Sequence, residues 1–131
     1  MVHIIAMAAA VSLLQDINTE RVTHGLRPLV MDARLASAAS GHADDMARRG
    51  YFAHESPGGV SPFDRMRAAG CSFDYAAENI ALAPDVQTAD TALYQSVPHR
   101  ENTLSPSYNR VGIGVARDAN GNEYFVEDFS N

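Results

Sequence analysis

The chain has 131 residues, of which 46% are apolar and 20% are charged, and its formal net charge at pH 7 is −6. This length fits one domain with a buried core, and the ordinary composition excludes general disorder. With 10 Lys and Arg against 16 Asp and Glu, the chain has no strongly basic region. Neither nucleic acid nor an anionic membrane is therefore an expected partner.

The first ten residues, MVHIIAMAAA, are apolar and have two interpretations. They are similar to a short secretory signal with small residues near a cleavage site, but the basic residues that precede such a segment are missing. They also continue without a break into a stretch where Val11, Leu14 and Ile17 have helical spacing. We predict a helix over residues 4–23, with residues 1–10 as a signal remnant or a helix extension and the domain proper over 11–131. The apolar run is too short and too interrupted to predict a transmembrane segment.

A second helix is predicted over about residues 33–48. Asp32 is placed to cap its start and Gly50 to end it. One stripe of this helix carries apolar residues and one histidine: Leu35, Ala39, His42 and Met46. Many of its other residues are alanines, so another element can approach it closely.

Two shorter helices follow. The segment SPFDRMRAAG has the signature of a capped helix, with Ser61 as N-cap, Pro62 in the first turn and Gly70 as terminator. A further helix fits residues 86–96, and Pro98 is expected to end it.

The last third of the sequence changes to a period of two. Val111, Ile113 and Val115 alternate along RVGIGVARD, and YFVEDFS follows after a turn at Asn120-Gly121. Helices followed by a hairpin predict an α+β domain, built as a three-layer α-β-α sandwich with a small antiparallel sheet flanked by helices.

The single cysteine and three of the five histidines have ordinary structural interpretations. Cys71 has no base beside it in the sequence and is interpreted as a small buried residue. His3 lies in the ambiguous leader, and His24 is placed to interact with the last carbonyls of the first helix. His42 lies on the apolar stripe of the second helix, where a packed histidine is expected.

The other two histidines lie beside turn-forming residues. His54 precedes Pro-Gly-Gly and a turn serine, Ser56, while His99 follows Pro98. Between them, Glu78 lies among small and apolar residues, where a carboxylate needs a partner. Two histidines and a glutamate fit a metal site or an acid, a base and an orienting carboxylate. Their spacing matches no compact zinc motif, so the residues alone leave this open.

A series of segments extends this interpretation: GLRPL, LASAASGHADDMARRGYFAH, SPFDRMRAAG, AENIA, SVPHRENTL and RVGIGVA. Over about residues 11–130 the chain resembles the bacterial branch of the CAP superfamily, also called SCP-like. This superfamily groups cysteine-rich secretory, antigen-five and pathogenesis-related-one proteins. The resemblance implies a three-layer sandwich that is secreted or held in the cell envelope, with a surface cleft lined by two histidines and acidic residues.

Carried over position by position, the resemblance makes His54 and His99 the histidines of that cleft and Glu78 its acidic residue. It implies that the two histidines hold Zn²⁺ or another divalent metal. Asn79, Arg100 and Asn102 are interpreted as support for the site, since amides and a guanidinium tie down loop backbone. The family's second glutamate falls on Ser96, so this site has three members.

Three functions follow from this comparison. We expect a monomeric, secreted binding module whose cleft takes a divalent metal and a lipid, glycan or peptide ligand. The first alternative is a hydrolase of the peptidase type, with His54, Glu78 and His99 as catalytic candidates. The second is a structural extracellular domain with an idle cleft. The incomplete acidic set weakens acid/base catalysis more than metal binding, so a non-enzymatic module is favoured.

Overall fold

A computed structural model of the chain describes residues 2–131, with side chains described from residue 4 onward. Its elements in chain order are α1 (Val2–Thr23), β1 (Val30–Met31), α2 (Ala33–Arg49), α3 (Pro62–Ala68), β2 (Ala76–Ala83), α4 (Val86–Gln95), α5 (Val97–Thr103), β3 (Arg110–Arg117) and β4 (Glu123–Ser130). The predicted helices and the C-terminal hairpin are confirmed. The part of the chain that the structure describes contains no helix that is long and apolar enough to cross a membrane.

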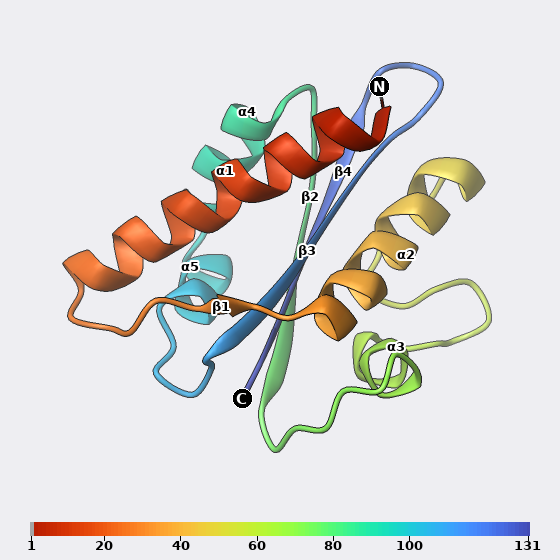
Figure 1. The fold of residues 1–131 in the computed structure, drawn as a ribbon. Coiled ribbons are helices and arrows are strands. Elements are labelled where there is room, and N and C mark those ends of the chain that lie inside the picture. Colours follow the sequence, from red (N-terminus) through yellow and green to blue (C-terminus); the bar gives the residue numbers. More distant parts are fainter. Residues whose placement is uncertain (1) are drawn as a thin grey trace.

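The strands form one sheet in the order β1-β3-β4-β2. Helices α1, α4 and α5 cover one face of this sheet, and α2 and α3 cover the other (Figure 1). The predicted three-layer α-β-α sandwich is therefore confirmed. The sheet is mixed rather than wholly antiparallel, because the two-residue strand β1 pairs in parallel with β3. No strand was predicted at these two residues from the sequence.

Helix α2 rests directly on the backbone of β3. A Cβ atom on Gly112 would lie 2.0 Å from the carbonyl carbon of Leu35, and one on Gly114 would lie 2.4 Å from that of Ala39. No side chain fits into that space, so the strand needs glycine at both positions. The predicted close approach to the alanine-rich helix is confirmed, and the glycines of the partner strand complete it.

The buried side of α1 differs from the predicted one. Val11 is 51% exposed, whereas Leu13 and Arg21 are almost fully buried together with Ile17. The Arg21 guanidinium donates to four backbone carbonyls, those of Arg27, Thr103, Ser105 and Tyr108. These bonds and the four-residue spacing of the buried positions set the rotation of the helix. Residues 2–10 continue this helix, and their interpretation as a signal remnant stays a prediction.

Pro98 does not terminate the helical region as predicted. Helix α4 ends at Gln95, and Pro98 lies in the first turn of a separate helix, α5. Proline is well tolerated there because the first helical N–H groups need no intrahelical acceptor. His99 therefore lies on a helix rather than in a loop.

The turn between β3 and β4 is built around Asp118. Its carboxylate accepts from the backbone N–H groups of Asn120 and Asn122. Within this turn, Gly121 has a positive φ, at 85°, and Asn120 does not, so Asn120 does not adopt the left-handed conformation that the turn prediction allowed. The hydrogen bonds of the Asp118 side chain stabilise the turn instead.

Candidate functional site

The loop that carries His54 connects α2 to α3 and is folded by its own backbone. The Ser56 N–H donates to the Val60 carbonyl, and the Gly59 N–H donates to the Ser56 carbonyl, both over 2.9 Å. Gly58 and Gly59 both have positive φ angles. The Ser56 hydroxyl accepts from Arg65 at 3.1 Å. Ser56 is thus a turn residue, as predicted, and the loop holds His54 with its side chain 51% exposed.

Glu78 lies on β2 beneath His54, and its side chain is only 1% exposed. Its Oε1 atom lies 2.9 Å from Nδ1 of His54, and its Oε2 atom accepts from the Arg65 guanidinium at 3.1 Å. Burial by itself would raise the pKa of Glu78, but the hydrogen bond with His54 and the charge of Arg65 help to lower it. An ionised Glu78 accepts a hydrogen bond from the Nδ1–H group of His54, and in the neutral ring this arrangement puts the lone pair on Nε2.

His99 is held in a similar way by a different residue. Its Nδ1 atom lies 2.7 Å from the hydroxyl of Ser96, the N-cap residue of α5. Burial, followed by the charge of His54, lowers the pKa of His99. Ser96, the position to which the resemblance assigns the family's second glutamate, therefore engages the Nδ1 atom of His99. When the hydroxyl accepts from Nδ1–H, the lone pair of the neutral ring is on Nε2.

The predicted supporting residues form a network under His99. Asn79 is fully buried and donates to the His99 carbonyl at 3.1 Å and to Glu127 at 3.2 Å. Asn102 donates to the Asn79 carbonyl oxygen at 2.9 Å. Arg100 donates to the carbonyl of Tyr94 at 3.1 Å and stacks over its ring, so it holds the end of α4. These contacts connect all three residues to the segments around His99, and their role in support of a site stays a prediction.

Two residues of the site were missed by the sequence reasoning. Arg65, on α3, donates to the His54 carbonyl at 2.7 Å as well as to Glu78. Asp128, on β4, is paired with Glu78 across the strands and is fully buried. In the sequence, the position of Glu78 among small and apolar residues indicated that its carboxylate needs a partner. The sequence could not say which arginine would reach it.

Two other histidines lie where the sequence predicted. His42 is 1% exposed, and its Nε2 atom donates to the Ala53 carbonyl at 2.8 Å. Nδ1 of His24 lies 2.8 Å from the Glu20 carbonyl near the end of α1. The side chain of His3 falls outside the described residues. Cys71 is half-buried against a small apolar cluster, and burial raises the pKa of its thiol.

The structure brings His54 and Glu78 into direct contact, and places His99 close enough for the charge of His54 to affect its pKa. Among the side chains of residues 4–131, no three of His, Cys, Asp or Glu are grouped in a way that could hold a metal ion. Four hollows on the described chain are lined by residues other than these two histidines and Glu78. A ligand cleft between the two histidines therefore stays a prediction.

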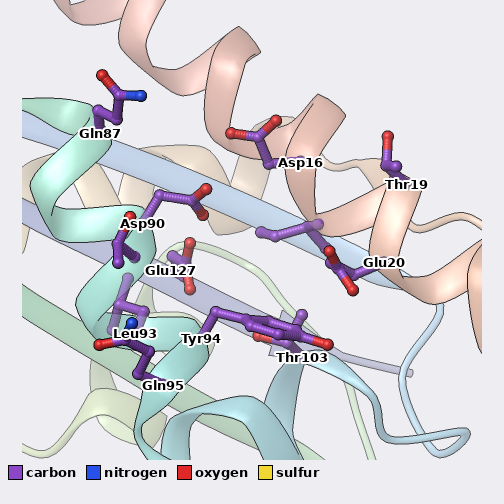
Figure 2. A pocket seen from close by; sticks show the side chains of 12 residues that line it. Asp16, Thr19, Glu20, Gln87, Asp90, Leu93, Tyr94, Gln95, Thr103 and Glu127 are labelled. Atoms are coloured by element: carbon purple, nitrogen blue, oxygen red, sulfur yellow. The ribbon is translucent and has the colours of Figure 1, made fainter.

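One of these hollows, of about 340 Å³, lies between α1 and α4 on the opposite face of the sheet. Figure 2 shows Asp16 and Glu20 of α1 facing Asp90 of α4, with Glu127 of the sheet between the helices. Burial, and then the nearby Asp16, raises the pKa of Asp90 to about 7. Burial also raises the pKa of Glu127 to about 7. The sequence analysis did not find this acidic hollow.

A three-layer sandwich with a histidine and a buried glutamate on one side of its sheet defines the class of protein, and sequence comparison gives the family. The family model of the cysteine-rich secretory protein family, CAP, matches residues 14–129. The chain belongs to this family, and the resemblance predicted from its motifs is confirmed.

Two curated relatives from Bacillus subtilis (strain 168) are similar in sequence. The uncharacterized protein YkwD is 39% identical over 98 residues, which are 74% of this chain and 38% of the relative. The uncharacterized membrane protein YlbC is 35% identical over 113 residues, 86% of this chain and 31% of the relative. The chain thus spans less than two fifths of the length of either relative.

A solved structure shares the fold closely. It is an extracellular protein containing an SCP domain from Bacillus anthracis, with a TM-score of 0.88 and 29% identity over 96% of this chain and 41% of that one. The relatives of this CAP domain therefore include a bacterial extracellular protein and one named as a membrane protein.

Proposed function

We propose that this CAP domain is an extracytoplasmic binding module in which His54 and His99 bind a divalent metal such as Zn²⁺ through their Nε2 atoms. The supporting observation is that both rings are engaged at Nδ1, by Glu78 and by Ser96, and keep Nε2 free. Histidine ligands of metals usually have their other ring nitrogen fixed by an oxygen in this manner. Two imidazoles and water would leave open coordination positions for a ligand.

The donor set suits zinc but is small. Neutral imidazole nitrogen is a preferred zinc ligand, and burial and the charge of His54 help to keep His99 neutral. Glu78 is not counted as a ligand, because its carboxylate is buried and already engaged by His54 and Arg65. A metal held by only two protein ligands should bind weakly and exchange readily.

The peptidase alternative has less support. A general base must reach the proton that it removes, in a protonation state that accepts it. Glu78 is 1% exposed, and two partners engage its oxygens and lower its pKa, so it is a poor proton acceptor. We therefore favour binding without turnover. A lipid, glycan or peptide as the further ligand is part of this proposal.

The relatives support a location outside the cytoplasm. The Bacillus anthracis protein that shares the fold is described as extracellular. A more distant structure of the fold, at 14% identity, is named as NaASP2 with Zn²⁺, and at that identity only the fold is shared. The metal proposal thus depends on the imidazoles of this chain.

Calorimetric titration of Zn²⁺ into chelator-treated protein tests the proposal. We expect His54→Ala and His99→Ala each to weaken zinc binding by about 10-fold or more. Loss of a residue that orients a metal ligand typically lowers the affinity by about that factor, and loss of the ligand itself should lower it at least as much. His24→Ala is the matched control, because His24 is exposed and lies at the end of α1. Equal binding by wild type and both site variants would contradict the proposal.

The affinity should also depend on pH with a defined sign. Zinc binds the neutral imidazole, so protonation of either ring competes with the metal and affinity should fall from about pH 8 to about pH 5. The pKa of His99 is lowered from its ordinary value of 6.5. This ring should therefore stay neutral, with a lone pair available for the metal, at pH values below 6.5. Affinity that is constant over this range would indicate a carboxylate site elsewhere.

A further inference from the structure

Asp128 is a buried acid whose position calls for an explanation. It lies directly opposite Glu78 in the β2–β4 register, so both side chains project from the same face of the sheet. Asp128 is 0% exposed, and neither of its carboxyl oxygens has a hydrogen-bond donor among the described residues. A buried carboxylate without donors is costly, so the ionised form is disfavoured here.

Among the described residues, Arg65 is the cation whose charge acts on Asp128. Arg65 of α3 already donates to Ser56, Val60, the His54 carbonyl and Glu78, although its buried Nε atom has no acceptor. His42 of α2 donates from Nε2 to a carbonyl, and burial lowers its pKa, which favours the neutral ring. The nearby Cys71 thiol has a raised pKa and is neutral as well. One guanidinium therefore serves two carboxyl groups.

We propose that Asp128 is a neutral carboxylic acid that keeps its proton, donates a hydrogen bond to the Glu78 carboxylate and so positions Glu78 against His54. Two carboxyl groups at one buried site do not both ionise, and the group with fewer partners keeps the proton. Glu78 has His54 and Arg65 as partners, whereas Asp128 has neither. Burial and the charge of Glu78 raise the pKa of Asp128 well above its usual range, in agreement with this assignment.

The consequence reaches the imidazole. With Arg65 and Asp128 both donating to it, Glu78 keeps one negative charge in a fixed orientation. Its Oε1 atom then holds the proton of His54 on Nδ1 and leaves the Nε2 lone pair exposed. Asp128 is thus a positioning residue for His54. Its relevance to metal binding rests on the proposed function, but its effect on the ring does not.

Carbon-13 titration of the Asp128 carboxyl group in the metal-free wild type tests the proposal directly. We expect this group to stay protonated at neutral pH, and to ionise at a lower pH in Glu78→Gln, which removes the neighbouring charge. Ionisation of Asp128 at neutral pH in the wild type would overturn the inference. This measurement does not depend on any Asp128 variant folding.

Nitrogen-15 shifts of the His54 ring, again without metal, test the positioning role. Asp128→Asn keeps a hydrogen-bond donor, so His54 should remain predominantly the Nδ1–H tautomer. Asp128→Val removes the donor, so the ring should become a mixture of tautomers. Asp44→Asn, at an exposed position of α2, is the control. Equal tautomer ratios in wild type and Asp128→Val would contradict the positioning role.

A zinc titration of the same variants separates the two proposals. Asp128→Val should weaken binding by about 10-fold, while Asp128→Asn should stay near wild type. If the tautomer result holds but the wild type does not bind zinc, the proposed function fails and the role of Asp128 stands.

Discussion

Glu78 and Glu127 lie on paired strands and are almost equally buried, yet their acid strengths shift in opposite directions. The Glu78 side chain is 1% exposed and its pKa is lowered. Glu127 is 2% exposed and its pKa is raised to about 7. Glu78 lies on the side of the sheet that faces α2 and α3, together with Arg65 and His54. Glu127 lies in the acidic hollow between α1 and α4 (Figure 2), where it accepts from the amide of Asn79.

The difference shows that the partners of a buried carboxyl group, rather than its burial, decide its charge in this protein. A guanidinium and an imidazole stabilise the anion at Glu78, but a neutral amide beside other acids does not do so at Glu127. The side of the sheet that carries His54 therefore keeps a fixed negative charge. The other side carries an acid that titrates near neutrality.

The largest expected effect comes from removing the cation. Arg65→Met should destabilise the protein by about 3–5 kcal/mol, because Glu78 is left buried without its charged partner. Denaturant unfolding measures this loss. Adding Glu78→Gln to Arg65→Met should recover part of the stability, since the unpaired charge is then gone.

Arg67→Met is the matched control for this pair. Arg67 lies on the same helix, but it is exposed and stacks over Phe73. Arg67→Met should lower the free energy of unfolding clearly less than Arg65→Met does. A loss at Arg65 no larger than the loss at Arg67, or no recovery in the double variant, would refute the assignment of Arg65 as the residue that keeps Glu78 ionised.

A smaller, pH-dependent effect is expected on the other face. The Glu127 pKa is raised from 4.5 to about 7 in the folded state, so the unfolded chain loses this proton first and stability falls as pH rises between these values. Glu127→Gln should therefore be more stable than wild type by about 1–3 kcal/mol at about pH 8 and similar near pH 4. Thermal unfolding across pH, with the exposed Glu101→Gln as control, checks this. A gain that does not vary with pH would show that folding does not raise the pKa of Glu127.

The smallest change in stability should come from Ser96. Ser96→Ala removes one hydrogen bond to His99, which should cost about 1 kcal/mol, but it should weaken zinc binding about 10-fold. Calorimetry and thermal unfolding separate the two effects, and the exposed Ser72→Ala serves as control. Unchanged zinc affinity in Ser96→Ala would mean that this hydroxyl does not orient the ring for a metal.

Much of the fold could be predicted because its signals are local. Asp32 and Ser61 cap the helices that they were predicted to cap, and the side chain of each accepts from the backbone as expected. The strand β3 was visible in the alternation of Val111, Ile113 and Val115. The predictions failed where the structure depends on contacts between residues that are far apart in the chain. The rotation of α1 depends on hydrogen bonds from Arg21 to carbonyls as distant in sequence as that of Tyr108. The strand β1 forms by pairing with β3.

The site was predicted in part for the same reason. His54 and Glu78 could be placed together only through the family resemblance, and the structure brings them within 2.9 Å. Asp128 was missed because every residue of β4 is buried, so this strand has no polar face that would single out an unusual acid. The resemblance placed the missing second glutamate at Ser96, which stays a prediction, and the contact of Ser96 with His99 depends on the turn between α4 and α5.

By itself, the sequence determined the helices α1 to α4, the C-terminal hairpin, the predicted caps and the family, because these depend on neighbours within a few positions and on motifs of fixed spacing. The tertiary structure alone decided which acids keep their protons. Glu78 and Asp128 are 50 positions apart along the chain and meet only through strand pairing, and Arg65 reaches them only from α3. Charge inside a protein depends on what folding places within a few ångströms, and no local pattern in the chain records that distance.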